Sequence, residues 1–325
     1  MLLAAVLAAG ICTALLPLLV PALQRRAVLD HPGDRSSHTV PTPRGGGLAV
    51  ATALCAAALV VEPGASTAIF AGAVLLTAGI GLLEDLRGVP IAQRLAVHLI
   101  AGTLLATLLI DGLSPVAAVL VVLAVAVAAA AVVNAVNFMD GINGISAATG
   151  LAAGTAYAVT GAVLNDRPLA VVGAAVAAAC VAFAPWNVPR ARVFLGDVGS
   201  YGLGAALAGC AVLAVRAGAP PEAVVAPLTL YLGDTGTVIL GRLRRRESLG
   251  QPHRLHAYQR LTDTGLSHPT VSGIVLGVTA LLCVLGLVSL TGPAPALRVA
   301  AGAAATAVLT AYLLLPRRST NLRAP

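Results

Sequence analysis

Apolar residues run along almost the whole chain in stretches of roughly 20, separated by short polar segments. A stretch of that length can cross the roughly 30 Å hydrocarbon core of a bilayer as an α-helix. The pattern therefore predicts an all-α polytopic membrane protein, and we interpret residues 1–325 as one integral-membrane domain. We expect about eleven transmembrane helices, at 2–22, 45–61, 67–83, 95–110, 114–133, 144–163, 168–185, 198–215, 221–241, 270–290 and 297–315.

The composition supports this prediction. Hydrophobic side chains make up 58% of the residues and charged ones only 10%, whereas soluble domains average about 25% charged residues. The first apolar run lacks a basic segment before it and a small-residue cleavage site, so we expect a retained helix and not a signal peptide. All five cysteines fall inside apolar runs without paired spacing, which is typical of small buried residues and not of disulfides or zinc ligands.

The distribution of arginine predicts the orientation in the membrane. All 20 basic residues are arginines; the odd-numbered loops and the C-terminal tail hold 17 of them, and the other loops hold three. Because basic residues accumulate in cytoplasmic loops, we expect the N-terminus outside and the C-terminus in the cytoplasm. Nine of the thirteen acids and all six histidines lie at or near the predicted cytoplasmic side, so an active site is expected at that face.

Five polar clusters interrupt the apolar pattern, and the first lies in the first cytoplasmic loop, Asp30–Gly47. It combines Arg35, His38 and Arg44 with three consecutive glycines. Glycines at a helix start allow the backbone N–H groups to approach a phosphate closely, with arginines to pair with it. The alternative is a loop that is basic only because of its orientation.

The second and third clusters place acids at helix ends. Glu84 and Asp85 end the third apolar run, where the helix dipole disfavours acids, so a cation, an arginine or a proton is expected as their partner. The alternative is a solvated helix end. The third cluster, NAVNFMDGINGISAA at 134–148, sets Asp140 and three asparagines between two apolar runs. Polar groups are costly in lipid, which indicates a wet, ligand-occupied end.

The fourth and fifth clusters follow later in the chain. In RARVFLGDVGSYGLG, Asp197 stands among glycines at a helix start; it could simply cap the helix, but the glycines favour close approach of a bulky anion. In the segment 230–261, Asp234 lies inside the ninth run, and an arginine run precedes His253 and His256. Two histidines alone lack the further ligands of a zinc site, so phosphate binding is the better interpretation.

These five clusters, in this order, resemble the polyprenyl-phosphate N-acetylhexosamine-1-phosphate transferases of glycosyltransferase family 4. That family includes the phospho-MurNAc-pentapeptide translocase and the GlcNAc-1-phosphate transferases. The resemblance runs from about Asp30 to Leu261, and SSHTVPTPRGGG and HRLHAYQRL are most similar to the branch that primes surface polysaccharides.

The resemblance implies a reaction at the cytoplasmic face of the bacterial inner membrane. A polyprenyl (undecaprenyl or decaprenyl) phosphate attacks a UDP-N-acetylhexosamine, UMP is released, and the polyprenyl-diphospho-sugar primes cell-envelope polysaccharide. The implied cofactor is Mg²⁺, with Mn²⁺ as the alternative, and the implied partners are the UDP-sugar, the lipid and a second copy of the chain, but no nucleic acid. The residues leave open which sugar and which prenyl length are used.

The resemblance also implies roles for single residues. Asp197 is the expected metal ligand. Expected catalytic residues are Glu84, Asp85, Asp140, His253 and His256. Expected substrate-binding residues are Arg35, His38, Arg44, Asn134, Asn137, Asn143, Gly196, Ser200 and Arg254. The role of Asp234 is left open.

Two positions depart from the family pattern. Glu84 stands where an Asp is usual, so the base could be either acid of the pair, and Asp85 is favoured because its reach is unaltered. Asn143 stands where a second Asp is usual; its amide can both donate and accept, so we expect it to recognise uracil and not to act as a base. An inactive family member is one alternative. A secondary transporter is the other, although the acids gather at one face and no repeat is evident.

Overall fold

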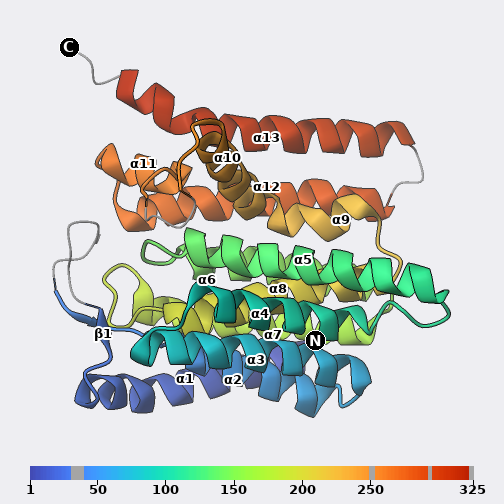
Figure 1. Ribbon diagram of the computed structural model, residues 1–325, viewed down its shortest axis with the longest axis horizontal. Helices are drawn as coiled ribbons and strands as arrows, with labels where there is room; N and C mark the ends of the chain where they lie inside the picture. Colours follow the sequence, from blue (N-terminus) through green and yellow to red (C-terminus); the bar gives the residue numbers. More distant parts are fainter. Residues whose placement is uncertain (31–39, 249–252, 292–294, 322–325) are drawn as a thin grey trace.

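The computed structural model describes residues 1–30, 40–248, 253–291 and 295–321. Most of its helices run side by side as one bundle (Figure 1). In chain order the elements are α1 Leu2–Arg25, β1 Leu29–Asp30, β2 Thr42–Pro43, α2 Gly47–Val61, α3 Ala65–Arg87, α4 Ile91–Ala106, α5 Pro115–Met139, α6 Ile145–Val163, α7 Arg167–Asn187, α8 Gly196–Arg216, α9 Pro221–Val225, η1 Ala226–Leu228, α10 Thr229–Arg244, α11 Ala257–Asp263, α12 His268–Thr291 and α13 Pro295–Asn321.

The prediction of an all-α polytopic membrane protein is confirmed. Each of the eleven expected spans coincides with helical structure. In the described part of the chain, eight segments are long and apolar enough to cross a membrane, namely α1, α3, α5, α7, α8, the stretch Pro221–Arg244, α12 and α13. The helices α2 and α4 are shorter, with 15 and 16 residues. The orientation of the bundle in the membrane stays a prediction.

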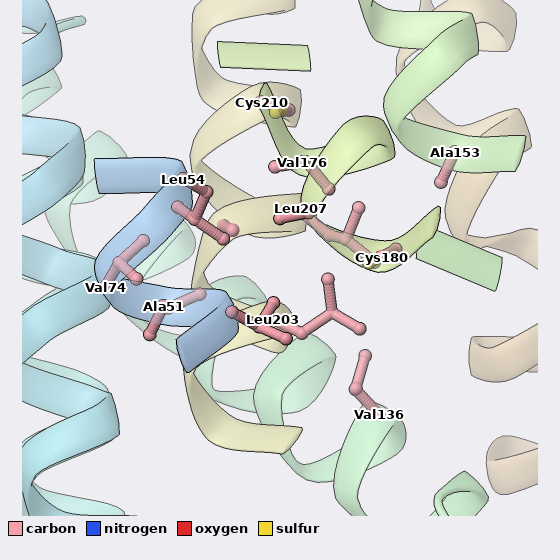
Figure 2. Packing of buried hydrophobic residues seen from close by; sticks show 14 of the residues in the cluster. Ala51, Leu54, Val74, Val136, Ala153, Val176, Cys180, Leu203, Leu207 and Cys210 are labelled. Carbon is pink, nitrogen blue, oxygen red and sulfur yellow. The ribbon is translucent and has the colours of Figure 1, made fainter. Parts of the chain in front are cut away.

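Helix α8 forms the centre of the bundle. In its membrane-length segment 89% of the residues are buried inside the protein, against 17% in α13. Figure 2 shows Leu203, Leu207 and Cys210 of α8 packed among side chains of α2, α3, α5 and α7, such as Leu54 and Val176. A central helix has protein on all sides, so its first turn is held in place by several neighbours at once.

Small residues bring the helix backbones unusually close. A Cβ added at Gly154 of α6 would lie 2.8 Å from the carbonyl oxygen of Gly173 in α7, and one at Gly204 of α8 would lie 2.6 Å from the Cα of Val133 in α5. Lipid tails give helices no hydrophobic reason to associate, so close van der Waals packing of this kind holds the bundle together.

The ninth expected span is not one straight helix. It is divided into α9, η1 and α10, and Figure 1 shows α10 tilted steeply against its neighbours. Pro227 lies at the break, where its ring and its missing N–H group interrupt an α-helical ladder. The short helix α11 is a further difference, since it lies in a segment that we expected as a loop.

The triple glycine packs against protein backbone. The N–H groups of Gly45 and Gly46 both donate to the carbonyl oxygen of Phe194, and that of Gly47 donates to the carbonyl oxygen of Leu195 at 2.8 Å. A Cβ on Gly47 would lie 2.0 Å from the Cα of Gly199. The expectation that these N–H groups bind a phosphate is therefore wrong, because they already serve to dock α2 onto the start of α8.

Candidate functional site

A cavity of about 330 Å³ opens at one end of the bundle, where α3 and α5 end and α8 begins. The short strand β1, which contributes Asp30, lies at the left in Figure 1 and marks this end. The lining residues are Asp30, Arg44, Asp85, Asn137, Asp140, Gly141, Ile142, Asn143, Asn187, Phe194, Leu195, Gly196 and Asp197. Residues from four of the five polar clusters thus meet in one place.

Asp85 caps the N-terminus of α8 from across the cavity. Its two carboxylate oxygens accept the backbone N–H groups of Asp197 and Val198, at 3.1 and 3.0 Å. Arg44 lies on its outer side, with 3.7 Å between the guanidinium Nε and the carboxylate. The side chain of Asp85 is buried, and both of its oxygens hold the first turn of α8. We expected an acid at the end of a helix to need a partner, and the partners are the N–H groups at the start of α8 and the arginine Arg44.

Gly196 is required by the same arrangement. Its φ is +75°, a conformation that residues with a Cβ rarely adopt. A Cβ at this position would also lie 2.6 Å from a carboxylate oxygen of Asp85. Gly196 therefore lets α8 begin directly against Asp85.

Asp197 faces the cavity and is oriented by an asparagine. The side-chain amide of Asn137 donates to Oδ1 of Asp197 at 2.6 Å and to the hydroxyl of Ser200 at 3.0 Å. Ser200 is fully buried below the cavity floor. The pair Asn137 and Ser200 thus fixes the position of the Asp197 carboxylate, and Ser200 itself does not line the cavity.

Asp140 follows the last residue of α5 and faces the same cavity. Burial raises its pKa to about 7; the hydroxyl of Ser146, which donates to Oδ1 at 2.6 Å, opposes this rise, and the charges of Asp197 and Asp85 add to it. Near neutral pH this carboxyl group can therefore hold or release a proton. A cation in the cavity would favour the ionised form.

The loop from Asp140 to the start of α6 is fixed by backbone contacts. Asn143 donates its side-chain amide to the carbonyl oxygen of Pro189 at 3.2 Å, and its own carbonyl accepts from Ser272 at 2.7 Å. Gly144, with a φ of +87°, donates its N–H to the side chain of Asn187. Among the described residues, the amide oxygen and the second amide N–H of Asn143 form no hydrogen bond, and base recognition would need such groups.

Glu84 and Asn134 lie apart from the cavity lining. Glu84 forms an ion pair with Arg94 at 3.0 Å, and the same guanidinium donates to the hydroxyl of Tyr201 at 3.1 Å. Asn134 lies one turn deeper along α5 and contacts the buried ring of His98, with 3.3 Å between Nδ2 and Nδ1. Of the adjacent acids, the structure thus brings Asp85 and not Glu84 into the cavity.

His256 and His253 form a second group beside the cavity. Their rings lie 5.2 Å apart, and His256 stacks on Tyr258 at 5.8 Å between ring centroids. The hydroxyl of Tyr258 donates to the carbonyl of Phe138 at 3.1 Å, and it occupies the space that a Cβ on Gly141 would need. Tyr258 therefore connects the histidines to the cavity wall.

The remaining expected residues are placed differently. Arg254 lies in the histidine segment and pairs with Asp263 at the surface, at 2.9 Å. Arg35 and His38 lie outside the described residues.

The carboxylates of Asp140 and Asp197 suit a hard divalent cation whose other ligands are water and substrate phosphates. In the described ranges, no three His, Cys, Asp or Glu residues converge as a complete metal site. Asp197 and Asp140 do share one cavity, and the carboxylate of neither caps a helix as that of Asp85 does. Mg²⁺ keeps several waters and binds through one or two carboxylates together with substrate phosphates, so these two residues would suffice to hold it.

Six lining residues were not among the expected site residues, namely Asp30, Gly141, Ile142, Asn187, Phe194 and Leu195, and two of them have a clear role or character. Asn187 donates to the carbonyl of Val193 at 3.0 Å and accepts from Gly144, so it joins the end of α7 to the loop before α6. Phe194 adds an aromatic ring to the polar lining. Both lie in or next to the fourth polar cluster, but an Asn near a loop and a Phe in an apolar chain give no local signal of a site.

Comparison with known proteins now points to a family. The pattern of glycosyl transferase family 4 matches residues 67–215, which carry the acidic pair of α3, the loop between α5 and α6 and the start of α8. The central part of the chain, residues 67–215, thus carries the pattern of glycosyl transferase family 4.

Three curated proteins have sequences similar to that of this chain. Decaprenyl-phosphate N-acetylglucosaminephosphotransferase of Mycobacterium tuberculosis is 28% identical over 77% of this chain and 73% of its own length. The protein of the same name in Mycobacterium leprae is 29% identical over 76% and 73%. Phospho-N-acetylmuramoyl-pentapeptide-transferase of a Synechococcus strain is 37% identical, over 42% of each chain. The longer similarity is thus to the N-acetylglucosamine-phosphate transferases.

Proposed function

We propose that this protein transfers N-acetylhexosamine 1-phosphate from a UDP-sugar to a polyprenyl phosphate and releases UMP. The observation that carries the proposal is the meeting of Asp140, Asp197 and Arg44 in one cavity at the helix ends. Two carboxylates that can hold a divalent cation, next to a guanidinium, suit a reaction between two phosphate-bearing molecules. The names of the mycobacterial relatives support the choice of N-acetylglucosamine as the sugar and decaprenyl phosphate as the lipid.

In the proposed reaction an oxygen of the polyprenyl phosphate attacks the β-phosphorus of the UDP-sugar. A new P–O bond forms, the bond from that phosphorus to the bridging oxygen breaks, and UMP leaves with the electron pair. Such transfers depend on positioning and on neutralisation of charge more than on covalent chemistry. Mg²⁺, or Mn²⁺ in its place, would supply that neutralisation from Asp197 and Asp140, while Arg44 would hold a phosphate oxygen at the rim.

This reaction needs little help from a general base. A phosphate monoester has a second pKa of about 6, so most of the acceptor is already doubly ionised at neutral pH. Both oxygens of Asp85 hold the start of α8, and Glu84 pairs with Arg94. We therefore assign Asp85 to the positioning of Asp197, and we assign abstraction of a proton to neither acid of the pair.

An apolar cavity supports a prenyl acceptor. It measures about 290 Å³, lies between α5, α8, η1 and α10, and is lined by residues such as Val132, Val212 and Leu232. Its lining holds only Ala, Val and Leu, which fits an isoprenoid chain and excludes a sugar or nucleotide. The bacterial origin of the relatives and the arginine distribution support a reaction at the cytoplasmic face of the inner membrane.

The test is a direct assay of the purified full-length protein in detergent. It is given Mg²⁺, polyprenyl phosphate and a panel of UDP-N-acetylhexosamines, and UMP release is measured. We expect release with at least one UDP-sugar and none without the lipid or after addition of EDTA. If no sugar gives UMP while a control transferase is active under the same conditions, the protein is an inactive family member and the proposal fails.

A further inference from the structure

Asp234 is a buried carboxylate in α10 that the proposed chemistry does not use. Its side chain is 1% exposed. It accepts the backbone N–H of Ala257 at 2.9 Å and the hydroxyl of Tyr312 at 3.3 Å, and it contacts Nδ1 of His256 at 3.1 Å. One carboxylate thus joins α10, α11 and α13 at the N-terminus of α11.

These contacts determine which nitrogen of His256 carries a proton. The donors from Ala257 and Tyr312 favour an ionised Asp234, and an ionised carboxylate can only accept hydrogen bonds. Nδ1 of His256 is then the donor in this contact, and Nε2 lies on the other edge of the ring. Nε2 is buried and has no hydrogen-bond partner among the described residues.

The surroundings of the ring leave Nε2 for a ligand. Titratable groups face His256 from each element packed on it: Asp234 of α10, Tyr258 of α11, and His253 in the loop before α11, with Tyr312 of α13 behind the carboxylate. Phe138, whose ring stacks on His256 with 6.3 Å between the centroids, lies in α5 two residues before Asp140. The histidine therefore stands beside the wall of the candidate active site with one nitrogen held and the other unpaired.

We propose that Asp234 is the positioning residue for His256: its carboxylate fixes the ring, holds the proton on Nδ1, and presents Nε2 to the phosphoryl-transfer site. The inference rests on the proposed transferase function, and it gives Asp234 a role through the histidine. The contact between Asp234 and His256 should affect kcat more than KM, because it sets the orientation of the imidazole ring in the transition state and not the binding of the substrate.

The test compares Asp234→Asn in two backgrounds, with UMP release as the measurement. In the otherwise native protein the substitution removes the charge that fixes the ring, and we expect kcat to fall by roughly 10²- to 10⁴-fold with KM for the UDP-sugar changed by less than about threefold. In a His256→Ala background the same substitution should lower the residual kcat by less than about threefold, because Asp234 then has no ring to position.

The matched control is Asp166→Asn. Asp166 also caps a helix, accepts from Leu169 at 2.9 Å and pairs with Arg216, but it lies at the other end of the bundle, so kcat should stay at the native value. If Asp234→Asn does not give folded protein, Asp234→Glu, which keeps the charge, is measured in the same two backgrounds. It should then retain at least about tenfold more activity than His256→Ala.

The outcomes separate the two proposals. Absence of UMP release from the native protein overturns the transferase function before any variant is made. Native UMP release together with full activity of Asp234→Asn, or an equal loss of kcat with and without His256, overturns the positioning role and leaves the transferase function standing. A loss of kcat that disappears in the His256→Ala background supports it.

Discussion

Asp197 and Asp140 face one cavity but are held in different ways. Asp197 is oriented by the amide of Asn137, at 2.6 Å, and Asp140 by the hydroxyl of Ser146, also at 2.6 Å. Each uses one carboxylate oxygen in these contacts, whereas both oxygens of Asp85 accept backbone N–H groups at the start of α8. At the scale of single residues, Asp140 and Asp197 can thus act on a ligand, whereas Asp85 builds the site.

Replacement of Asp197 by asparagine tests its expected role as metal ligand. Loss of the charge should lower kcat by roughly 10²-fold or more and raise the Mg²⁺ concentration needed for half-maximal activity. The measurement is UMP release over a Mg²⁺ titration, with Asp166→Asn as the control that should behave as the native protein. Full activity of Asp197→Asn at the native Mg²⁺ requirement would contradict the assignment.

Replacement of Ser146 by alanine tests the state of Asp140. The pKa of Asp140 is raised to about 7, and the Ser146 hydroxyl holds it down, so its removal raises that pKa further. If the ionised carboxylate is the active form, activity is lost as pH falls through this pKa. The acidic limb of the kcat/KM profile should therefore move to higher pH in Ser146→Ala, and an unmoved limb would show that Asp140 does not set it.

At the scale of elements, the site depends on how closely α2 and α8 approach. Gly45 and Gly46 just before α2, and Gly47 at its first position, donate hydrogen bonds to the carbonyl groups just before α8. Gly47 leaves no space for a side chain. The first turn of α8, which carries Asp197, is thereby held between Asp85 of α3 and the start of α2. A change in the packing of α2 against α8 should therefore move Asp197 and lower activity.

Replacement of Gly47 by alanine should disturb this packing. A Cβ would lie 2.0 Å from the Cα of Gly199, so the helices must separate, at a cost of about 3 kcal/mol in the free energy of unfolding. The melting temperature in detergent and the rate of UMP release should both fall. The control is Gly79→Ala in α3, where a Cβ meets no neighbour and higher helix propensity should stabilise by up to about 1 kcal/mol. Equal melting temperatures for the two variants would refute the packing argument.

The polar residues of the site could be found in the sequence because burial makes them costly. Asp85, Asn137, Asp140 and Asp197 stand out against apolar surroundings, and the structure brings all four into one cavity. Spacing alone could not show that Asn134, one turn from Asn137, stops short of the cavity, because both lie on nearly the same face of α5.

The features of the site and fold that could not be predicted depend on contacts between residues far apart in the sequence. The capping of α8 by Asp85 joins residues 112 positions apart, and no local pattern encodes it. The same holds for Asn187, whose importance comes from its two backbone partners. The break at Pro227 was visible as a residue, but the apolar run continues through it, and hydropathy alone cannot distinguish a kinked span from a straight one.

At the scale of the whole molecule, the functional cavity and most of the arginines lie at one end of the bundle. If the arginine-rich end is cytoplasmic, the cavity also faces the cytoplasm. The five native cysteines are buried, so a cysteine introduced at the surface can be labelled selectively.

Labelling of intact cells should show the orientation. A cysteine at Asp111, exposed in the turn between α4 and α5, should react with a membrane-impermeant maleimide added outside. A cysteine at Arg190, exposed near the cavity, should react only after the membrane is permeabilised. The reverse pattern would place the cavity on the outer face.

The charges around the cavity have a further consequence for the order in which ligands bind. Its lining carries four aspartates, at positions 30, 85, 140 and 197, and one arginine, Arg44. An anionic UDP-sugar entering this field alone would be repelled, so we expect it to arrive as its complex with a divalent cation or to follow one. Calorimetry should then detect nucleotide-sugar binding with Mg²⁺ and little in EDTA, and equal affinity in both would mean that the protein neutralises its substrate without a metal.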